Sequence, residues 1–387
     1  MIRLYVFVVA VSLTGVVAIS AADDNEVDTI QVVEIMEQLR AFSFHPIVDG
    51  MTKEPMLNNT DGVANTEDQA WRVRLLAIRD ITRLGPDVAP HLLNYLKDDN
   101  EHVRQVSAFV LGLFPDPRGE QALIDLLQQE SDVVVRSQAA LSLGRLRSNA
   151  SLAILKDLEK NDPSRDVRHQ CSLAIHRITE YAAAEPDLAA AFAQLDESHF
   201  EQVRIGAQAP EFILNDVDGK EWRLSDFLGK QSVALIWIFA DWCPVCHNEF
   251  RELIRLKEAY KEAGVQVFSI ECSDPYRARV MAGLEYQPEY WFSKKSPQEF
   301  YGDKLWWPHL IDLGCAVGAT YGVQPMQFTV HAEWINRPAT ILIDKEGIVR
   351  FAYYGTFWGD RPSLRQALNM LVEGNYEFEH PKRLKLE

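Results

Sequence analysis

Trp242-Cys243-Pro244-Val245-Cys246 is the segment on which the interpretation of this sequence depends. The apolar run before it, Val233–Phe239, has the length and the β-branched and aromatic content of a buried strand. The residues after it, His247–Ala263, repeat apolar side chains at helical spacing. A sulfur at a strand-to-helix junction lies at the positive end of the helix dipole, which favours thiolate over thiol. The sequence therefore predicts a reactive dithiol at this junction.

The same segment has other chemical interpretations. A thiolate with a second sulfur three residues later can carry out disulfide exchange, because one sulfur attacks and the other resolves. His247, however, completes Cys-x-x-Cys-His, the pattern of c-type haem attachment. A Cys-x-x-Cys pair can also be half of a zinc site, for which Cys272 and His309 are the candidate partners. The rest of the sequence has to distinguish these chemistries.

Length, charge and the first residues limit the class of protein. The 387 residues are enough for two or three domains, and a net charge of −17 argues against a nucleic-acid partner. Residues 22–66 hold nine acidic and two basic residues, which predicts a solvated lead-in. Residues 1–21 combine Arg3, an apolar stretch and small residues, the layout of a secretory signal peptide. We expect an extracytoplasmic protein, periplasmic or secreted, with a membrane anchor at residues 1–21 as the alternative.

A repeat occupies the first half of the chain. Each unit carries a Val-Arg pair, followed three residues later by a small side chain and seven residues later by a large aliphatic one. The pairs stand at 73–74, 103–104, 135–136 and 167–168. This pattern predicts two amphipathic helices in each unit, with the small side chains at close helix contacts. We expect the arginines to pair with acids or carbonyl groups of neighbouring units.

Residues 67–181 resemble the HEAT-like repeat family on these positions. The resemblance implies an α-solenoid, a fold that mostly presents surfaces to partner proteins.

A strand–helix–strand order surrounds the dithiol. Gly264–Ile270 predicts a second buried strand, which runs parallel to the first because a helix connects them. Arg337–Asp344 and Ile348–Tyr353 predict two antiparallel strands with a tight turn at Gly347. A helix is expected near residues 363–373. The second half is therefore predicted to be an α/β domain.

Residues 204–374 resemble the redoxin branch of the thioredoxin superfamily, which includes TlpA-like thiol-disulfide oxidoreductases and peroxiredoxins. The resemblance rests on Gly206–Phe212, Trp242–Cys246 and Pro338–Asp344. It implies that Pro338 is a cis-proline beside the dithiol. The predicted fold class is multidomain, an α-solenoid followed by an α/β thioredoxin-like fold. The expected parts are a signal peptide (1–21), an acidic lead-in (22–66), HEAT-like repeats (67–181), a helical linker (182–203), a redoxin domain (204–376) and a tail (377–387).

The resemblance implies an exported thiol-disulfide oxidoreductase that acts on protein disulfides. Cys243 is expected to attack a client disulfide and Cys246 to resolve the mixed disulfide. Four further residues are expected to support the pair or bind substrate: Trp242, Pro244, Arg337 and Pro338. No metal and no cofactor are expected. The expected partners are protein clients, a redox partner that recharges the dithiol, and proteins bound by the repeats.

Three alternatives stay open. A peroxiredoxin-like thiol peroxidase would use Cys246 as its peroxidatic cysteine, although Cys243 replaces the threonine of that family. Arg337 stands one residue from the place of the peroxiredoxin arginine. A c-type haem would be attached at Cys243, Cys246 and His247. In a non-enzymatic interaction scaffold, the repeats alone would carry the function.

The proton relay is a separate question. Trp237 stands where many thioredoxins bury an acid, so Glu271 and Asp241 are the candidates instead. A charged Asp241 next to the pair would oppose the thiolate.

Overall fold

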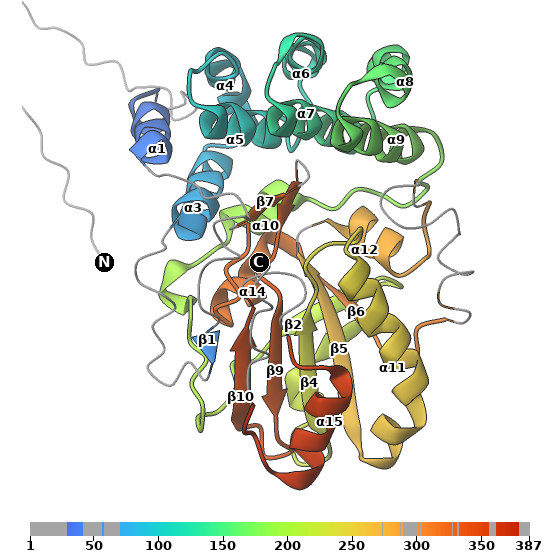
Figure 1. Ribbon diagram of the computed structural model, residues 1–387. Coiled ribbons are helices and arrows are strands. Elements are labelled where there is room, and N and C mark those ends of the chain that lie inside the picture. The colour runs from blue at the N-terminus through green and yellow to red at the C-terminus, as the bar shows by residue number, and fades with distance from the viewer. Residues whose placement is uncertain are drawn as a thin grey trace, which may run out of the picture.

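The computed structural model describes residues 29–41, 56–57, 70–272, 274–286, 288, 301, 304–326, 328–330, 333–355 and 361–378. The expected signal peptide at residues 1–21 lies outside them. An array of helices lies across one end of an α/β domain, which confirms the predicted multidomain class (Figure 1). No helix in the described ranges is long and apolar enough to span a membrane.

The array is built of paired helices. Its inner helices, α5, α7 and α9, lie nearer the α/β domain than the outer helices α4, α6 and α8 (Figure 1). Each inner helix begins at a side chain that accepts backbone N–H groups: Asn100, Asp132 and Ser164. The helices are α1 (Thr29–Ala41), α3 (Ala70–Arg83), α4 (Ala89–Tyr95), α5 (Glu101–Leu111), α6 (Pro117–Gln129), α7 (Val133–Arg145), α8 (Leu152–Asn161) and α9 (Arg165–Thr179). The solenoid predicted from the repeat is confirmed.

Two of the repeated arginines join neighbouring units. Arg104 pairs with Glu130 at 2.7 Å, and its guanidinium also donates to backbone carbonyl groups of the preceding loop. Arg136 pairs in the same way with Asp162 at 3.2 Å. In both pairs the carboxylate stands 26 residues after the arginine. Arg104 and Arg136 therefore have the structural role that the sequence predicts, whereas Arg168 donates to carbonyl groups of its own preceding loop.

Helix α1 departs from the prediction of a solvated lead-in. It buries one face in the same core as α3, with Val32, Ile35, Met36 and Leu39 as the buried residues. Their spacing of three and four residues places them on one side of the helix. The acidic composition of residues 22–66 conceals this face, because only a few apolar residues are needed to make it.

A mixed sheet forms the centre of the α/β domain, with the strand order β1-β10-β9-β4-β5-β6-β2-β3. Strand β4 pairs in parallel with β5 and antiparallel with β9. Burial on both faces explains why β4 and β9 are apolar at nearly every position. The strands are β1 (Met56–Leu57), β2 (Ile213–Asp216), β3 (Glu221–Arg223), β4 (Ser232–Trp237), β5 (Val265–Cys272), β6 (His309–Asp312), β9 (Ala339–Ile343) and β10 (Val349–Tyr354).

Helices and one hairpin surround this sheet. Helices α11 (Pro244–Glu262) and α15 (Leu364–Glu373) lie side by side along it (Figure 1). The remaining elements are α10 (Leu188–Ala193), α12 (Pro275–Met281), α14 (Ala316–Thr320), and the hairpin of β7 (Phe328–Val330) and β8 (Glu333–Ile335). Short 3-10 helices lie at Pro86–Val88, Asn149–Ser151, Glu197–His199, Leu224–Asp226 and Leu313–Cys315.

The array and the α/β domain pack into each other. Phe109 of α5 stacks on Trp334 of β8, with ring centroids 4.7 Å apart. Arg74, the first arginine of the repeat, donates to the backbone carbonyl of Met326. A separate cluster joins α9 to α12 and contains Leu173, Tyr181, Tyr276 and Val280. The inner side of the array is therefore occupied by the chain's own second half.

Candidate active site

The dithiol lies at the N-terminus of α11, as the sequence predicts. Cys243 is the N-cap, and its sulfur accepts the N–H of Cys246 at 3.4 Å. Pro244 occupies the first helical position, where a missing N–H breaks no helical hydrogen bond. Trp242 packs edge-to-face on Phe239 beside the pair. Both cysteines have 0% of their surface exposed, so this is a buried pair.

Donors surround the sulfur of Cys246. The N–H of Phe239 donates to it at 3.3 Å, and Nη2 of Arg361 lies 3.4 Å away. Burial opposes the thiolate, but the hydrogen bond from Cys243, the charge of Arg361 and the N–H groups of Ala240 and Phe239 act in the other direction. Together they lower the pKa of Cys246 to about 5. These contacts therefore favour ionisation of Cys246 in the reduced pair.

Cys243 holds the proton that the two sulfurs share. Burial raises the pKa of Cys243 well above its ordinary value, and the hydrogen bond to Cys246 adds to this effect. A helix N-terminus alone favours ionisation of the N-cap sulfur, as the sequence suggests. In the structure the guanidinium of Arg361 contacts the sulfur of Cys246, which favours ionisation of that sulfur instead.

A carboxyl group completes this arrangement. Glu249 follows Cys246 by three residues on α11, and its Oε2 lies 2.7 Å from Nη2 of Arg361. Burial raises the pKa of Glu249 to about 8, and the charge of Cys246 raises it while that of Arg361 lowers it. Arg361 is fixed by a further hydrogen bond to the carbonyl of Trp237 at 3.0 Å. Sulfur, guanidinium and carboxyl thus form one buried, connected group.

Sequence reasoning misses both Arg361 and Glu249. The spacing of Glu249 from Cys246 places both on one face of a helix, so this residue could have been found. Arg361 offers no such signal, because it stands 115 residues away in the loop before α15.

The two acids that the sequence suggests as proton relays have other surroundings. Asp241 binds Arg277 through both carboxylate oxygens, at 2.9 and 2.5 Å. Glu271 lines a cavity of about 50 Å³ between β5 and the array. The carboxyl group beside the thiolate is that of Glu249.

Arg337 and Pro338 form hydrogen bonds to the segments that follow β10 and precede β7. Arg337 donates to the carbonyl of Gly355 at 2.6 Å and to Oε1 of Gln324 at 2.7 Å. The carbonyl of Pro338 accepts the N–H of Gly355 at 2.8 Å. The peptide bond before Pro338 is trans, so the cis-proline implied by the resemblance is a wrong expectation. Trans is the lower-energy form of an X–Pro bond, and here it is compatible with these hydrogen bonds.

The surroundings of His247 argue against the haem alternative. Its Nε2 donates to the backbone carbonyl of Asp241 at 2.6 Å, which leaves Nδ1 to accept from the hydroxyl of Tyr301. Burial lowers the pKa of His247 to about 4, so the ring is neutral. The sequence suggests an exposed histidine on the first helical turn, but the ring is 1% exposed. With both nitrogens engaged inside the protein, His247 is not placed to bind haem iron.

The candidate zinc partners are also used elsewhere. Nδ1 of His309 lies 2.8 Å from Oγ of Ser269, which in turn accepts the indole N–H of Trp307. Cys272 lines the small cavity against the array. Among the residues that the structure describes, no group of three or more His, Cys, Asp or Glu side chains could hold a metal ion.

Known proteins resemble both halves of the chain. The AhpC/TSA family matches residues 205–352, and HEAT repeats match residues 89–176. The thiol-disulfide oxidoreductase ResA of Geobacillus thermodenitrificans is 29% identical over 154 residues, which cover 40% of this chain and 71% of that protein. ResA of Bacillus thuringiensis subsp. konkukian is 30% identical over 149 residues, covering 38% of this chain and 69% of that protein.

A solved structure, that of peroxidoxin BcpB from Mycobacterium tuberculosis, covers 44% of this chain and 97% of its own at 22% identity, with a TM-score of 0.34. The buried dithiol at a strand-to-helix junction and the similarity to ResA both indicate a redoxin domain. The chain belongs to the AhpC/TSA family of thioredoxin-superfamily redoxins and is an oxidoreductase with HEAT repeats before its redoxin domain.

Proposed function

We propose that the chain is a thiol-disulfide oxidoreductase that exchanges disulfides with client proteins through Cys243 and Cys246. The observation that supports this most is the buried pair at the start of α11, in which Arg361 and backbone N–H groups hold one sulfur as a thiolate. A thiolate with a neighbouring thiol three residues away is the functional unit of disulfide exchange. Similarity to ResA over most of that protein's length points the same way.

The first step joins Cys243 to the client. Cys243 gives its proton to the thiolate of Cys246 as its own sulfur attacks a client disulfide. One S–S bond forms between Cys243 and the client, and the second client sulfur leaves as a thiolate. Cys246 is now a neutral thiol, so the negative charge beside Glu249 has gone. Because that charge raises the pKa of Glu249, its loss favours transfer of the carboxyl proton to the client thiolate that has just left.

The second step resolves the mixed disulfide. Glu249, now ionised, accepts the proton of Cys246. Cys246 attacks the sulfur of Cys243, their S–S bond forms, and the client sulfur leaves. The client has gained two electrons, and the protein holds a disulfide. The same steps in reverse oxidise a client dithiol, so the redox partner sets the direction.

Trapping with serine variants tests this assignment. Reduced Cys246→Ser lacks the thiolate that accepts the proton of Cys243, so it should react with a disulfide-containing client more slowly. It should then remain joined to the client, because the resolving sulfur is absent. Cys243→Ser should form no stable mixed disulfide, and non-reducing gels with mass spectrometry would show the difference. Absence of any mixed disulfide with Cys246→Ser would contradict the proposal.

A peroxiredoxin-like thiol peroxidase is the second candidate. The contact between Arg361 and Cys246 favours it, since a thiolate beside a guanidinium and backbone N–H groups is suited to attack on peroxide. Peroxide consumption that survives Cys243→Ser but not Cys246→Ser would support this reading over protein disulfide exchange.

Export and partner binding are further proposals. We propose that residues 1–21 direct the chain out of the cytoplasm, where disulfide chemistry is favoured. The mass of the purified mature protein would show whether the segment is removed. Partner contacts through the repeats also stay a prediction. The inner helices already contact the redoxin domain, so we assign such contacts to the outer helices α4, α6 and α8, which lie on the side of the array away from that domain (Figure 1).

A further inference from the structure

A buried carboxylate lies next to the dithiol. Asp241 stands two residues before Cys243 and is 1% exposed. The turn that contains it is closed by a hydrogen bond from the N–H of Cys243 to the carbonyl of Ala240 at 3.1 Å. An uncompensated negative charge at this place would disfavour the thiolate and would itself be costly to bury. The site therefore needs a cation at Asp241.

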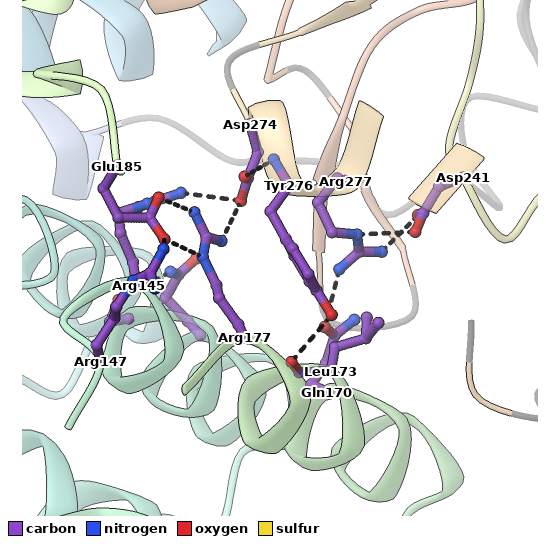
Figure 2. A network of polar contacts seen from close by, with 12 residues as sticks. Arg145, Arg147, Gln170, Leu173, Arg177, Glu185, Asp241, Asp274, Tyr276 and Arg277 are labelled. Carbon is purple, nitrogen blue, oxygen red and sulfur yellow. Dashed lines mark hydrogen bonds and ion pairs between the residues drawn. The ribbon is translucent and has the colours of Figure 1, made fainter. Parts of the chain in front are cut away.

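Arg277 supplies that cation. Its Nε and Nη2 bind the two carboxylate oxygens of Asp241 at 2.9 and 2.5 Å (Figure 2). Arg277 comes from α12 and is 4% exposed. A bidentate pair of this kind fixes orientation as well as charge, so it also holds the turn before Cys243. The turn carries the N–H groups of Phe239 and Ala240 that stabilise the thiolate of Cys246.

The repeat array holds Arg277 in turn. Nη1 of Arg277 donates to Oε1 of Gln170 at 3.0 Å, and Gln170 lies on α9 with 1% of its surface exposed (Figure 2). A chain of polar contacts thus leads from the last helix of the array to the residue next to Trp242.

The start of α12 is attached to the array as well. Asp274, its N-cap, pairs with Arg177 of α9 at 2.8 Å and with Arg145 of α7 at 3.3 Å (Figure 2). The hydroxyl of Tyr276 donates to the carbonyl of Leu173 at 3.3 Å. These contacts fix α12 against α9 but do not touch Asp241, which makes them useful controls.

We propose that Arg277 is a positioning residue for the dithiol and that Gln170 of the repeat array keeps it in place, so that the array tunes the redox site. The inference rests on the proposed function of Cys243 and Cys246. Arg277 neutralises Asp241 and fixes the turn whose N–H groups stabilise Cys246. Gln170 restricts the guanidinium to the orientation that reaches Asp241. The last repeat is thereby a component of the redox centre.

Titration of the thiolate in the full chain tests the proposal. The thiolate absorbance is followed against pH, and equilibrium with glutathione gives the reduced fraction. Arg277→Gln should raise the pKa of Cys246 by about one pH unit, because Asp241 loses its countercharge. The reduced form should become less stable in proportion, by roughly tenfold in the glutathione equilibrium. Gln170→Met keeps the volume and removes the acceptor, and should shift both values in the same direction by less.

Two further variants separate positioning from simple docking. Arg145→Gln weakens the contact between α12 and the array but leaves Asp241 untouched, so it should titrate like the wild type. The double variant Asp241→Asn/Arg277→Gln removes both charges and should return the pKa of Cys246 towards the wild-type value. Arg277→Lys should return part of it, since the charge is kept without the bidentate geometry.

The outcomes distinguish the inference from the proposed function. A wild-type dithiol with no low-pKa thiol and no glutathione equilibrium overturns the proposed function. A redox-active wild type that Arg277→Gln and Gln170→Met leave unchanged overturns only the inference. A shift in Arg145→Gln as large as that in Arg277→Gln does so too, because any loosening would then suffice. If Arg277→Gln does not fold, Gln170→Met and the double variant still decide, since neither leaves a single buried charge unpaired.

Discussion

Nη2 of Arg361 lies 3.4 Å from the sulfur of Cys246, although the two residues are 115 positions apart in the chain. Arg361 stands just before the capping box that begins α15, formed by Ser363 and Gln366. The countercharge of the thiolate is therefore delivered by the start of the C-terminal helix. The redox site is complete only when α15 has packed beside α11.

Removing this countercharge should suppress the reactivity of the dithiol. We expect Arg361→Leu to raise the pKa of Cys246 by at least about one pH unit, because a nearby opposite charge favours ionisation. Alkylation by iodoacetamide at about pH 4, below the pKa of Cys246 in both proteins, should slow about tenfold, since only the thiolate reacts. Arg361→Lys should be intermediate, and the exposed Arg350→Gln is the matched control. An unchanged alkylation rate in Arg361→Leu would mean that Cys243 and the backbone N–H groups stabilise the thiolate without Arg361.

Glu249 should give the protein a distinctive dependence of stability on pH. Its pKa is raised from 4.5 to about 8, so the neutral carboxyl favours the folded state. That contribution is fully present below pH 4.5 and is lost as the pH rises through about 8. Urea unfolding between pH 4 and 9 should show this loss in the wild type and not in Glu249→Gln.

The same variant should also resolve mixed disulfides more slowly, because an amide accepts no proton from Cys246. Glu258→Gln, an exposed change on the same helix, is the control. A wild-type profile in Glu249→Gln would move the proton-acceptor role to another group.

Close helix packing predicts a severe effect at Gly112. A Cβ at this position would lie 2.5 Å from Cβ and 2.9 Å from Cα of Ser142 on α7. We expect Gly112→Ala to lower the free energy of unfolding by about 1–3 kcal/mol, measured by chemical denaturation. Gly119→Ala is the comparison, because its Cβ would meet only the flexible end of Leu111 at 3.2 Å. Equal losses in both variants would argue against a rigid contact between α5 and α7.

The ion network at the start of α12 should be needed for stability. Burial opposes the charge of Asp274, but Arg177 and Arg145 hold its pKa far below the usual range. Asp274→Asn leaves two largely buried guanidinium groups without this partner, so the free energy of unfolding should fall by about 3–5 kcal/mol. Because the folded pKa is depressed, the wild type should lose this contribution only in strong acid.

Thermal unfolding followed by tryptophan fluorescence would measure the loss in Asp274→Asn. The exposed pair of Glu221 and Arg223 offers the control, and Glu221→Gln should keep a Tm close to that of the wild type. Equal Tm values for the two variants would contradict the structural role of the network.

Local patterns were enough to predict the framework of the molecule. The apolar run before Trp242 became β4, and the helical spacing after Cys246 became α11. The repeated Val-Arg pairs predicted the array because the pattern recurs at a nearly fixed period, and Arg104 and Arg136 each reach the next unit. These features depend on residues that are neighbours in sequence or recur at a fixed period.

The remaining features depend on contacts between distant segments, which no periodic pattern in the sequence indicates. Arg361 reaches the dithiol from a loop, and Arg277 reaches Asp241 from a short helix, so their roles depend on tertiary packing alone. Asp241 was expected to oppose the thiolate, and only the position of Arg277 shows how its charge is balanced. The face of α1 was hidden by its acidic surroundings. In each case the missing information was which distant segment packs against which.

The contact of Arg74 with Met326 at one end of the array has its counterpart in that of Arg177 with Asp274 at the other. The two ends of the array are therefore attached to two different places on the redoxin domain. Solenoids commonly change length by gaining or losing whole units. Here an added or deleted unit between Arg74 and Arg177 would break one of these two contacts. The number of repeats is therefore constrained by the width of the redoxin domain.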